Sequence, residues 1–446
     1  MTPSAIRLAP KVTTFLGLVT VVVAFYGAIH FIHPFYTHMY PFAWYGLILF
    51  IDGILWWKWN ESLIFKRPRE FVVLCFWSAV FWFFFEMWNL RLENWYYVGV
   101  TDNPIWAHVE AYLDFATVLP GMFLIYRLLE KLKIPGPVTT RQLSVPHMSK
   151  ISLFLGATML ALPAAFPNYF YFCIWGAFIF LFEPILARAA APSLLKEVLA
   201  GDWTRLIRLL AAGLFAGLYW ELCNFWSLER WVYTVPFFSE GKLFEMPYLG
   251  FLGFPPFCVE CFVITNTVYL LRGGRHWLPE WHRRQRSRAG GKTIYLALVL
   301  FSVIFAEWSY DKMTYHTVDS RAETIEQALT GIDPSIAERL TAKGLHYPKE
   351  ALHRWEEAAA SIPENMQGRV RNRLVLVSLL YMGSENARLL EHVGIDSRDD
   401  LAQAKASKLF QQLSHANDRL QLRRAPLLER RVMSWIVAAQ RTSPLY

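Results

Sequence analysis

The chain has 446 residues, enough for more than one domain, and a formal net charge of +8. Hydrophobic residues make up 54% of it and charged residues only 18%, whereas about a quarter of an ordinary soluble domain is charged. The composition therefore excludes an ordinary soluble enzyme. The apolar residues gather in runs close to the roughly 20 residues that cross a bilayer. We therefore predict an all-α, polytopic membrane helix bundle.

Nine membrane spans follow one another in chain order. They are predicted at residues 12–32, 40–57, 70–89, 105–129, 150–166, 169–187, 205–226, 247–271 and 292–309. The first span follows Arg7 and Lys11, as the apolar part of a signal sequence would. No small-x-small cleavage site follows it, so we expect this span to be retained.

The basic residues of the loops divide unequally between the two sides of the bundle. Before position 310, 22 Lys and Arg residues lie on the side of the N-terminus and three lie on the other side, namely Arg91, Arg230 and Lys242. The positive-inside rule then places the N-terminus and the basic loop 272–292 in the cytoplasm. An odd number of spans puts the C-terminal domain outside. We expect a protein of the cell inner membrane with a periplasmic or otherwise extracytoplasmic C-terminal domain.

Residues 311–446 are predicted to form this soluble helical domain. Segments beginning at Gly331 and Met382 have the pattern of helix-hairpin-helix units. From Arg373 to Gln440 the chain resembles a bacterial domain of unknown function built from tandem units of this kind. Such units often bind DNA, but 19 basic and 17 acidic residues leave little excess positive charge to bind phosphate. We therefore expect no nucleic acid here, and either an extracytoplasmic protein partner or a packing role.

An internal duplication runs through the membrane segment. Residues 85–97 (FEMWNLRLENWYY) and 220–233 (WELCNFWSLERWVY) match at an offset of 135 and then 136 residues. The matched pairs are Glu86/Glu221, Asn89/Asn224, Glu93/Glu229, Trp95/Trp231, Tyr97/Tyr233, Tyr112/Tyr248, Phe115/Phe251 and Pro120/Pro256, with Asp52/Glu183 at offset 131. Each copy holds four spans, so the copies share one orientation about an axis along the membrane normal.

Four regions follow from this duplication. The predicted regions are the first four-helix repeat (1–139), the second four-helix repeat (140–275), a basic loop with the ninth span (276–310) and the C-terminal domain (311–446). The ninth span then serves mainly to carry the C-terminal domain across the membrane.

Carboxyl groups within predicted spans are candidate functional groups, because a charged side chain at the bilayer centre costs about 2.5–3.5 kcal/mol on insertion scales. Glu86 and Glu221 lie late in the third and seventh spans. His108, Glu110 and Asp114 enter on the fourth span from the same side. The predicted catalytic residues are Glu86, Glu221, Asn89, Asn224 and Asp114. The predicted substrate-binding residues are Asp52, Glu183, Glu260, Trp95, Trp231, Tyr97 and Tyr233.

Two interpretations of these residues stay open. A carboxylic acid enclosed by apolar side chains stays protonated more readily than one in water, and it can donate a proton to a weakly basic substrate. Aromatic faces stabilise a developing cation, so the set suits isoprenoid cyclisation or hydration at membrane depth. In the structural interpretation, the Glu and Asn side chains hydrogen-bond across helices and the aromatic residues form an interfacial belt.

The order of motifs is the same in both copies. Each has an acid late in one span, a Trp-x-Tyr loop and then a proline-bearing span. The motifs are Trp220-Glu221, Trp231-Val232-Tyr233 and Pro255-Pro256 with Glu260 in the second copy, and Glu86, Trp95-Tyr96-Tyr97 and Pro120 in the first. This order resembles the small duplicated membrane lycopene cyclases and is similar to integral membrane terpene cyclases. The resemblance implies paired intramembrane acids that act on an isoprenoid.

Three functions therefore remain open. The first is a membrane enzyme that acts on a lipid-soluble, isoprenoid-like substrate. The second is a proton- or cation-coupled transporter or a lipid-handling protein, and the third is a scaffold that recruits a partner through its C-terminal domain. We expect no metal and no cofactor, because Cys258 and Cys261 lack a second ligand pair and the sequence contains no nucleotide-binding or zinc-protease motif.

Overall fold

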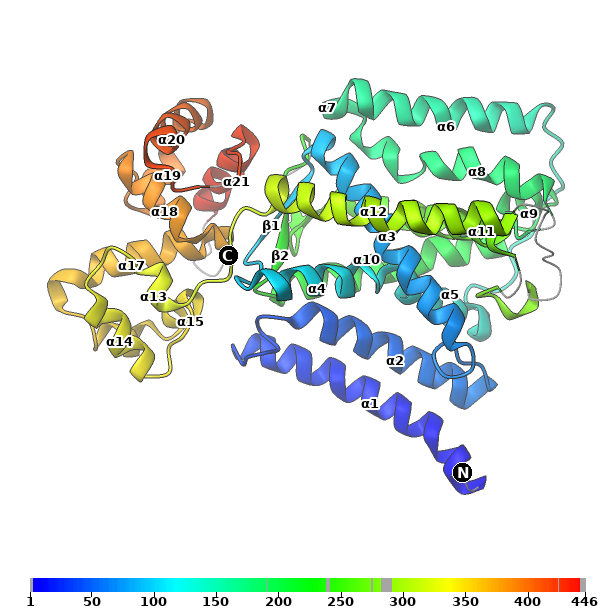
Figure 1. The fold of residues 1–446 in the computed structure, drawn as a ribbon, viewed down its shortest axis with the longest axis horizontal. Helices are drawn as coiled ribbons and strands as arrows, with labels where there is room; N and C mark the ends of the chain where they lie inside the picture. Colours follow the sequence, from blue (N-terminus) through cyan, green and yellow to red (C-terminus); the bar gives the residue numbers. More distant parts are fainter. Residues whose placement is uncertain are drawn as a thin grey trace.

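The computed structural model describes residues 3–189, 191–237, 241–273, 276–281, 291–423 and 425–441. Within these ranges the chain forms a bundle of long helices with a smaller helical domain at one end (Figure 1). We call this the domain end of the bundle. Nine helices of the described ranges are long and apolar enough to cross a membrane, which confirms the predicted fold class.

The first repeat supplies four of these spans. They are α1 (Pro3–Ile29), α2 (Met39–Trp59), α3 (Pro68–Leu92) and a bent span made of α4 (Pro104–Phe115) and α5 (Val118–Leu132). Helices α1 and α2 approach closely because small residues face the neighbouring backbone. A Cβ atom added to Gly17 would lie 2.3 Å from the backbone nitrogen of Phe50. Such close contact is how helices associate where no hydrophobic effect drives them together.

The second repeat follows the same order with one break. Its elements are α6 (Met148–Ala165), α7 (Pro167–Phe170), η1 (Tyr171–Trp175), α8 (Ala177–Arg188), α9 (Leu194–Leu199), α10 (Thr204–Trp226), η2 (Tyr248–Gly253), α11 (Phe254–Arg272) and η3 (Pro279–Trp281). The span equivalent to α2 is interrupted at Gly176, between η1 and α8. Buried Glu260 of α11 accepts the backbone N–H of Phe178, 2.9 Å away, in the first turn of α8, where backbone N–H groups have no partner within the helix. In the first repeat α2 is continuous and has no such helix start. The counterpart of Glu260 in that repeat is Leu124 of α5.

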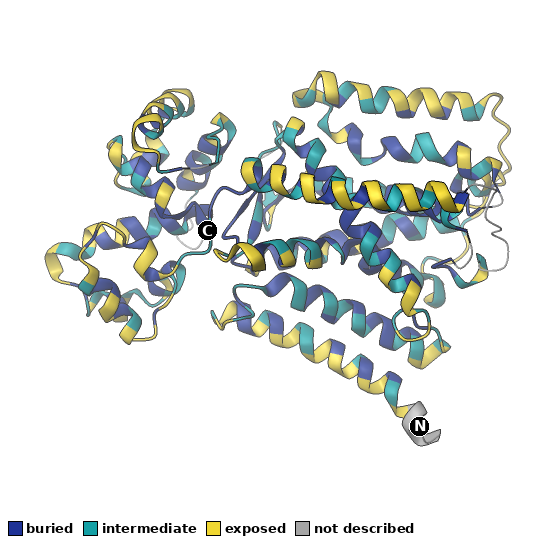
Figure 2. Cartoon of the chain, viewed as in Figure 1, coloured by how far each residue is buried: buried dark blue, intermediate teal, exposed yellow. Residues whose placement is uncertain are grey.

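The ninth span, α12 (Gly291–Thr317), lies against α3 on the outside of the bundle. Most of its surface is exposed, as is that of α6 (Figure 2). This agrees with a span that mainly connects the C-terminal domain to the bundle. Five arginines of the predicted basic loop lie outside the described residues: Arg275, Arg283, Arg284, Arg286 and Arg288.

A two-stranded ribbon closes the domain end of the bundle, where the sequence predicted only loops. It consists of β1 (Trp95–Val98) and β2 (Arg230–Tyr233), and a second small hairpin follows in β3 (Lys242–Leu243) and β4 (Met246–Pro247). The ribbon is antiparallel and pairs Trp95 with Tyr233 and Tyr97 with Trp231. Trp95 thus pairs with the repeat counterpart of Tyr97, and Tyr97 pairs with the repeat counterpart of Trp95. A two-fold axis through the centre of the ribbon requires this exchange.

Side chains of the ribbon alternate between its two faces. Trp95 and Tyr97 pack among residues of the bundle, whereas Tyr96 and Val98 join the core of the C-terminal domain. Val232 of β2 also joins that core. Equivalent residues of both copies face the same way, so the two-fold axis runs through the ribbon into the bundle. This is the common orientation that the duplication predicted.

The C-terminal domain is helical, as predicted. Its elements are α13 (Ile325–Ala328), α14 (Pro334–Ala342), α15 (Pro348–His353), α16 (Trp355–Ala359), α17 (Glu364–Ser378), η4 (Leu379–Tyr381), α18 (Gly383–His392), α19 (Arg398–Gln403), α20 (Ala406–Leu420) and α21 (Glu429–Gln440). Gly331 and Gly383 adopt positive φ at turns beside α14 and α18, and the helix-hairpin-helix interpretation of these turns stays a prediction.

A buried ion pair joins this domain to the segment that follows α12. The carboxylate of Asp319 accepts hydrogen bonds from Arg423 at 2.7 Å and from Arg431 at 2.9 Å. Burial alone would raise the pKa of Asp319, but the two guanidinium groups outweigh it and hold that pKa below its usual value. Next to Asp319, the Ser320 hydroxyl accepts the N–H of Gly99, just beyond β1, at 3.0 Å. The domain is therefore fixed directly to the ribbon.

Candidate functional site

The two predicted glutamates lie buried beneath the ribbon, one in each repeat. Glu86 of α3 and Glu221 of α10 are both fully buried. The hydroxyl of Tyr97 donates to Glu86 at 2.6 Å, and that of Tyr233 donates to Glu221 at 2.7 Å. Burial, reinforced by the adjacent carboxyl groups, raises the pKa of both tyrosines, so both remain protonated donors. The two glutamates therefore hold two tyrosines in equivalent positions.

The predicted asparagines fix the ends of the ribbon. Asn89 donates to the carbonyl of Trp95 at 2.9 Å and accepts its N–H at 3.2 Å. Asn224 makes the same two bonds with Trp231, at 3.0 and 2.9 Å. Both amides are thus occupied by the backbone, and they determine where each Trp-x-Tyr segment begins.

Asp52 and Glu183 lie at the opposite end of the bundle. Asp52 accepts hydrogen bonds from the Ser62 hydroxyl and the Leu63 N–H, both at 2.6 Å. Glu183 accepts the equivalent hydrogen bonds from the Ser193 hydroxyl at 2.7 Å and from the Leu194 N–H at 3.1 Å. These equivalent bonds fix two equivalent loops. Neither carboxylate lines the cavities described below.

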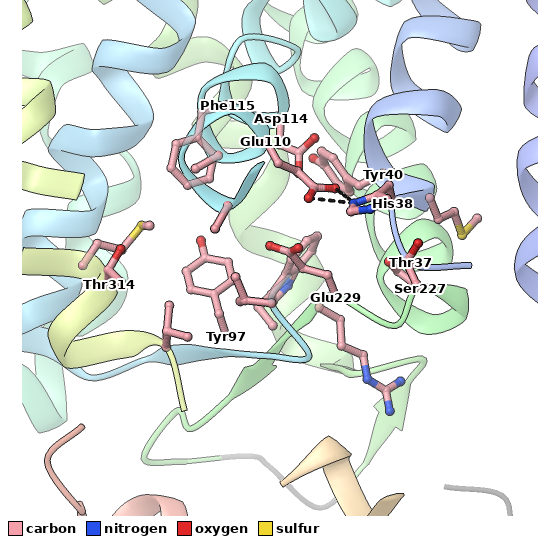
Figure 3. Close-up of a pocket in the computed structure, with 18 of the residues that line it drawn as sticks. Thr37, His38, Tyr40, Tyr97, Glu110, Asp114, Phe115, Ser227, Glu229 and Thr314 are labelled. Atoms are coloured by element: carbon pink, nitrogen blue, oxygen red, sulfur yellow. Dashed lines mark hydrogen bonds and ion pairs between the residues drawn. The ribbon is translucent and has the colours of Figure 1, made fainter. Parts of the chain in front are cut away.

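A cavity of about 50 Å³ beneath the ribbon brings three other carboxyl groups together. Figure 3 shows Glu110 and Asp114 of α4 reaching it from one side and Glu229, just before β2, from the other. We call it the acidic chamber. Its aromatic wall is formed by Tyr40, Trp82, Tyr97, Trp220 and Trp231.

The carboxyl groups of this chamber differ in their partners. Both oxygens of Glu110 lie 2.8 Å from Nδ1 of His38, in the segment before α2. One buried oxygen of Asp114 and one of Glu229 have no hydrogen-bond partner among the described residues. Buried polar atoms without partners are rare in folded proteins, and each calls for an explanation such as catalysis or an absent ligand. The chamber is therefore a candidate reaction site.

Glu229 lies outside the predicted spans, between α10 and β2. Its burial, followed by the nearby Glu110, raises its pKa well above the ordinary value, and the Arg321 guanidinium only partly opposes this. Burial therefore favours the protonated form of Glu229, which is the form that can donate a proton.

A second cavity, of about 160 Å³, lies on the other side of four shared residues. These residues, Trp82, Tyr97, Trp220 and Trp231, line both cavities and are called the partition below. The second cavity has no carboxyl group in its lining, and we call it the aromatic chamber. Its further aromatic walls are Trp95, Tyr171, Phe172, Trp175, Tyr233, Phe237, Phe254 and Phe257.

The two chambers occupy equivalent positions in the two repeats. At the offset of 136 residues, Glu110 and Asp114 correspond to Met246 and Gly250, which line the aromatic chamber. At the offset of 131 residues, Tyr40 of the acidic chamber corresponds to Tyr171 of the aromatic chamber. The duplication therefore produced two cavities, and only the first carries acids on its fourth span.

The predicted residues thus fall into separate places. Asp114, Tyr97 and Trp231 line the acidic chamber, and their predicted roles remain predictions. His108 lies outside it, 3.5 Å from Glu307 of α12. His38 was not predicted, and its position in the segment between the first two spans was the available signal. Glu229 was identified from the sequence only as a repeat match, and Glu110 only as a neighbour of Asp114.

No group of three His, Cys, Asp or Glu side chains that could hold a metal occurs within the residues that the structure describes. A family model described as "Domain of unknown function (DUF4332)" matches residues 349–442, within the C-terminal domain. No curated protein and no solved structure matches the chain. The match agrees with the domain of unknown function that residues 373–440 were expected to resemble. The comparisons show no similarity to lycopene cyclases, so that resemblance stays a prediction.

Proposed function

We propose that this protein is a membrane enzyme whose acidic chamber supplies acid and base to a lipid-soluble, isoprenoid-type substrate. One observation carries the proposal. The carboxyl groups of buried Glu110 and half-buried Asp114 and Glu229 face one aromatic-lined space, and Asp114 and Glu229 each have one buried oxygen without a partner among the described residues. General acids and bases require such groups within reach of a substrate and outside bulk water.

The proposed step is neutral in oxidation state. Protonated Glu229 donates its proton to one carbon of a C=C bond, whose π electrons form the new C–H bond, and the other carbon becomes a cation. The faces of Trp82, Trp220 and Trp231 stabilise this cation. Attack by a second C=C bond closes a ring, and the Asp114 carboxylate removes a proton to restore a double bond. In hydration, water adds to the cation and gives its proton to Asp114.

In this scheme Glu86 and Glu221 are positioning residues. They hold the hydroxyls of Tyr97 and Tyr233, and through them the ribbon that covers both chambers. His38 orients Glu110, whose proximity adds to the effect of burial in raising the pKa of Glu229. In this scheme Asp114 and Glu229 transfer the protons, and the predicted catalytic role of Glu86 and Glu221 stays a prediction.

Lipid extracts of cells that carry or lack the gene test this proposal. The wild-type protein is expected to produce a cyclised or hydrated lipid that is absent without the gene, and Asp114→Asn is expected to abolish it. Glu93→Gln is the matched control, because Glu93 is the repeat counterpart of Glu229 and lines neither chamber. Equal lipid profiles in all strains, or full product from Asp114→Asn protein that inserts normally, would contradict the proposal.

A second candidate is proton-coupled transport or lipid handling. It is favoured by the two-fold relation of the repeats, since duplicated transporters place their site between the two halves. Proton-dependent flux in vesicles, lost in Asp114→Asn while lipid profiles stay unchanged, would support transport and contradict the enzyme. A scaffold predicts instead that deletion of residues 311–446 abolishes function and that Asp114→Asn is tolerated.

We also propose an inner-membrane location with the domain end outside the cytoplasm. The support is the charge distribution, with 22 basic loop residues on the side of the N-terminus and three on the other. An alkaline phosphatase fusion after residue 441 is expected to be active, because this enzyme folds only outside the cytoplasm. An inactive fusion, together with an active one in the loop 58–69, would reverse the orientation.

A further inference from the structure

The aromatic chamber has the features of a ligand site in its own right. It is about three times as large as the acidic chamber, at about 160 Å³ against about 50 Å³. Apolar engineered cavities of roughly 150 Å³ remain free of water and bind benzene. A hydrocarbon segment the size of one ring, or of one to two isoprene units, therefore suits this volume.

The rim of the chamber opens toward the side of the bundle. Phe172 of η1 and Leu249 of η2 line it and are more than half exposed, at 58% and 51%. Both residues lie near the domain end of membrane spans. An exposed apolar rim at the side of a membrane bundle contacts lipid chains, so an apolar molecule can enter from the bilayer without crossing water.

One polar group in the chamber lacks a partner. Asn94, at the start of β1, lines the cavity and is 3% exposed, and its amide oxygen accepts no hydrogen bond from any described residue. The nearby Tyr233 hydroxyl is already donated to Glu221. A ligand that enters this chamber therefore meets a buried, unpartnered acceptor among mostly aromatic and aliphatic side chains, which suits a hydroxyl group.

We infer that the aromatic chamber binds the hydroxyl-bearing end of a membrane-dissolved isoprenoid lipid alcohol, which donates its hydroxyl to Asn94. The inference rests on the proposed function for the isoprenoid class, and on the cavity for the size and the hydroxyl. The partition of Trp82, Tyr97, Trp220 and Trp231 separates this end from the acidic chamber. A double bond further along the chain can then approach the partition, on whose other side the acids lie.

The test uses the full-length protein in phosphatidylcholine nanodiscs and a diazirine-tagged C10 isoprenoid alcohol as the probe. Photolabelling mapped by mass spectrometry is expected to concentrate on η1, η2 and the start of α11. Gly253→Leu is expected to reduce this labelling at least fivefold because its side chain fills the cavity. Gly253→Ala is the matched control, since an added Cβ would lie at an ordinary van der Waals distance of 3.8 Å from the Trp175 side chain.

A second variant keeps the inference testable if Gly253→Leu fails to fold. Asn94→Leu removes the acceptor, and it is expected to weaken binding of the alcohol probe about fivefold, as loss of one hydrogen bond predicts. It should leave binding of the matching diazirine-tagged C10 hydrocarbon unchanged. Labelling confined to other surfaces, or equal loss of alcohol and hydrocarbon binding in Asn94→Leu, would overturn the inference.

Failure of the proposed function looks different. If the acid chemistry is wrong but the chamber binds the lipid, the wild type shows the expected labelling and no lipid product. If the chamber does not bind it but the enzyme proposal holds, Gly253→Leu retains both product and labelling. Asp114→Asn is expected to retain labelling in either case, because it lies outside this chamber.

Discussion

The acidic and aromatic chambers have the same surroundings in the fold but different lining residues. Each lies beneath the ribbon, against the same partition, with a tyrosine held by a buried glutamate beside it. The first repeat places Glu110 and Asp114 where the second has Met246 and Gly250. The exchange of these two acids for Met246 of β4 and Gly250 of η2 thus accompanies the change from a polar cavity to an apolar one.

This difference shows which parts of the duplication are structural. The bonds that Asn89 and Asn224 make to the ribbon are the same in both copies, as are those of Asp52 and Glu183 to their loops. These residues carry the fold. Unpaired carboxyl oxygens lining a cavity occur only on the acidic side among the described residues, so the asymmetric positions are where function is to be sought.

The largest effect is expected when the two acids of α4 that line the acidic chamber are replaced by their counterparts in the aromatic chamber. The double substitution Glu110→Met with Asp114→Gly is expected to lower product formation about 10²–10⁴-fold, since a positioned acid or base contributes about that much. The measurement is product yield per amount of inserted protein. Glu307→Gln, which changes an exposed acid beside the same helix, is the control. Near-normal product from the double variant would show that the asymmetry has no catalytic meaning.

The next largest effect is expected at the buried ion pair that joins the C-terminal domain to the segment after α12. Asp319→Ala is expected to destabilise the protein by about 3–5 kcal/mol, because two buried arginines lose their common partner. The folded-state pKa of Asp319 is lowered, so its stabilisation is present above the unfolded-state pKa and is lost as the pH falls through the folded value. Thermal unfolding in detergent between neutral and acidic pH measures both effects. Exposed Asp311→Ala should change neither, and equal melting of the two variants would refute the prediction.

Tyr97 and Tyr233 test whether equivalent residues of the two repeats differ in their effect on activity. Tyr97→Phe and Tyr233→Phe each remove a donor from a buried glutamate and should destabilise the fold by roughly 1–3 kcal/mol. Only Tyr97 lines the acidic chamber, so only Tyr97→Phe is expected to change the pH profile of product formation. Unfolding and activity are measured on the same preparations. Identical pH profiles for both variants would remove Tyr97 from the site.

The smallest effect is the pH dependence itself. Glu229 donates only when protonated, and burial and Glu110 raise its pKa. Activity should therefore be present below that raised pKa and fall about tenfold per pH unit above it. Folding has the same sign, since a raised folded-state pKa stabilises at low pH and loses this stabilisation as the pH rises through the folded value. Activity that rises steadily with pH would contradict the role of Glu229.

The sequence was sufficient for the spans and the duplication. Runs of apolar residues report bilayer crossing directly, so the predicted span 205–226 agrees with α10 within a residue. The ribbon was missed because WYYV and RWVY are short and become strands only by pairing with each other, between residues 132 to 138 positions apart. Their aromatic and β-branched residues were the signal that could have revealed them.

The site was predicted only in part, for a related reason. Spacing along a helix shows that Glu86 and Asn89 share a face, but not that both are occupied by the ribbon. His38 meets Glu110 across 72 residues, a contact that only the packing of α2 and α4 creates. Asp114 was predicted because an acid well inside an apolar span is conspicuous.

Solvent-deuterium incorporation tests the central claim most directly. Wild-type protein in nanodiscs is incubated in D₂O with a linear isoprenoid lipid, and the product is analysed by mass spectrometry. Glu229 exchanges its proton with solvent between turnovers, so each product molecule should carry one deuterium bound to carbon. Glu229→Gln should form no such product. Product without deuterium, or deuterated product at the wild-type rate from Glu229→Gln, would contradict proton transfer in the acidic chamber.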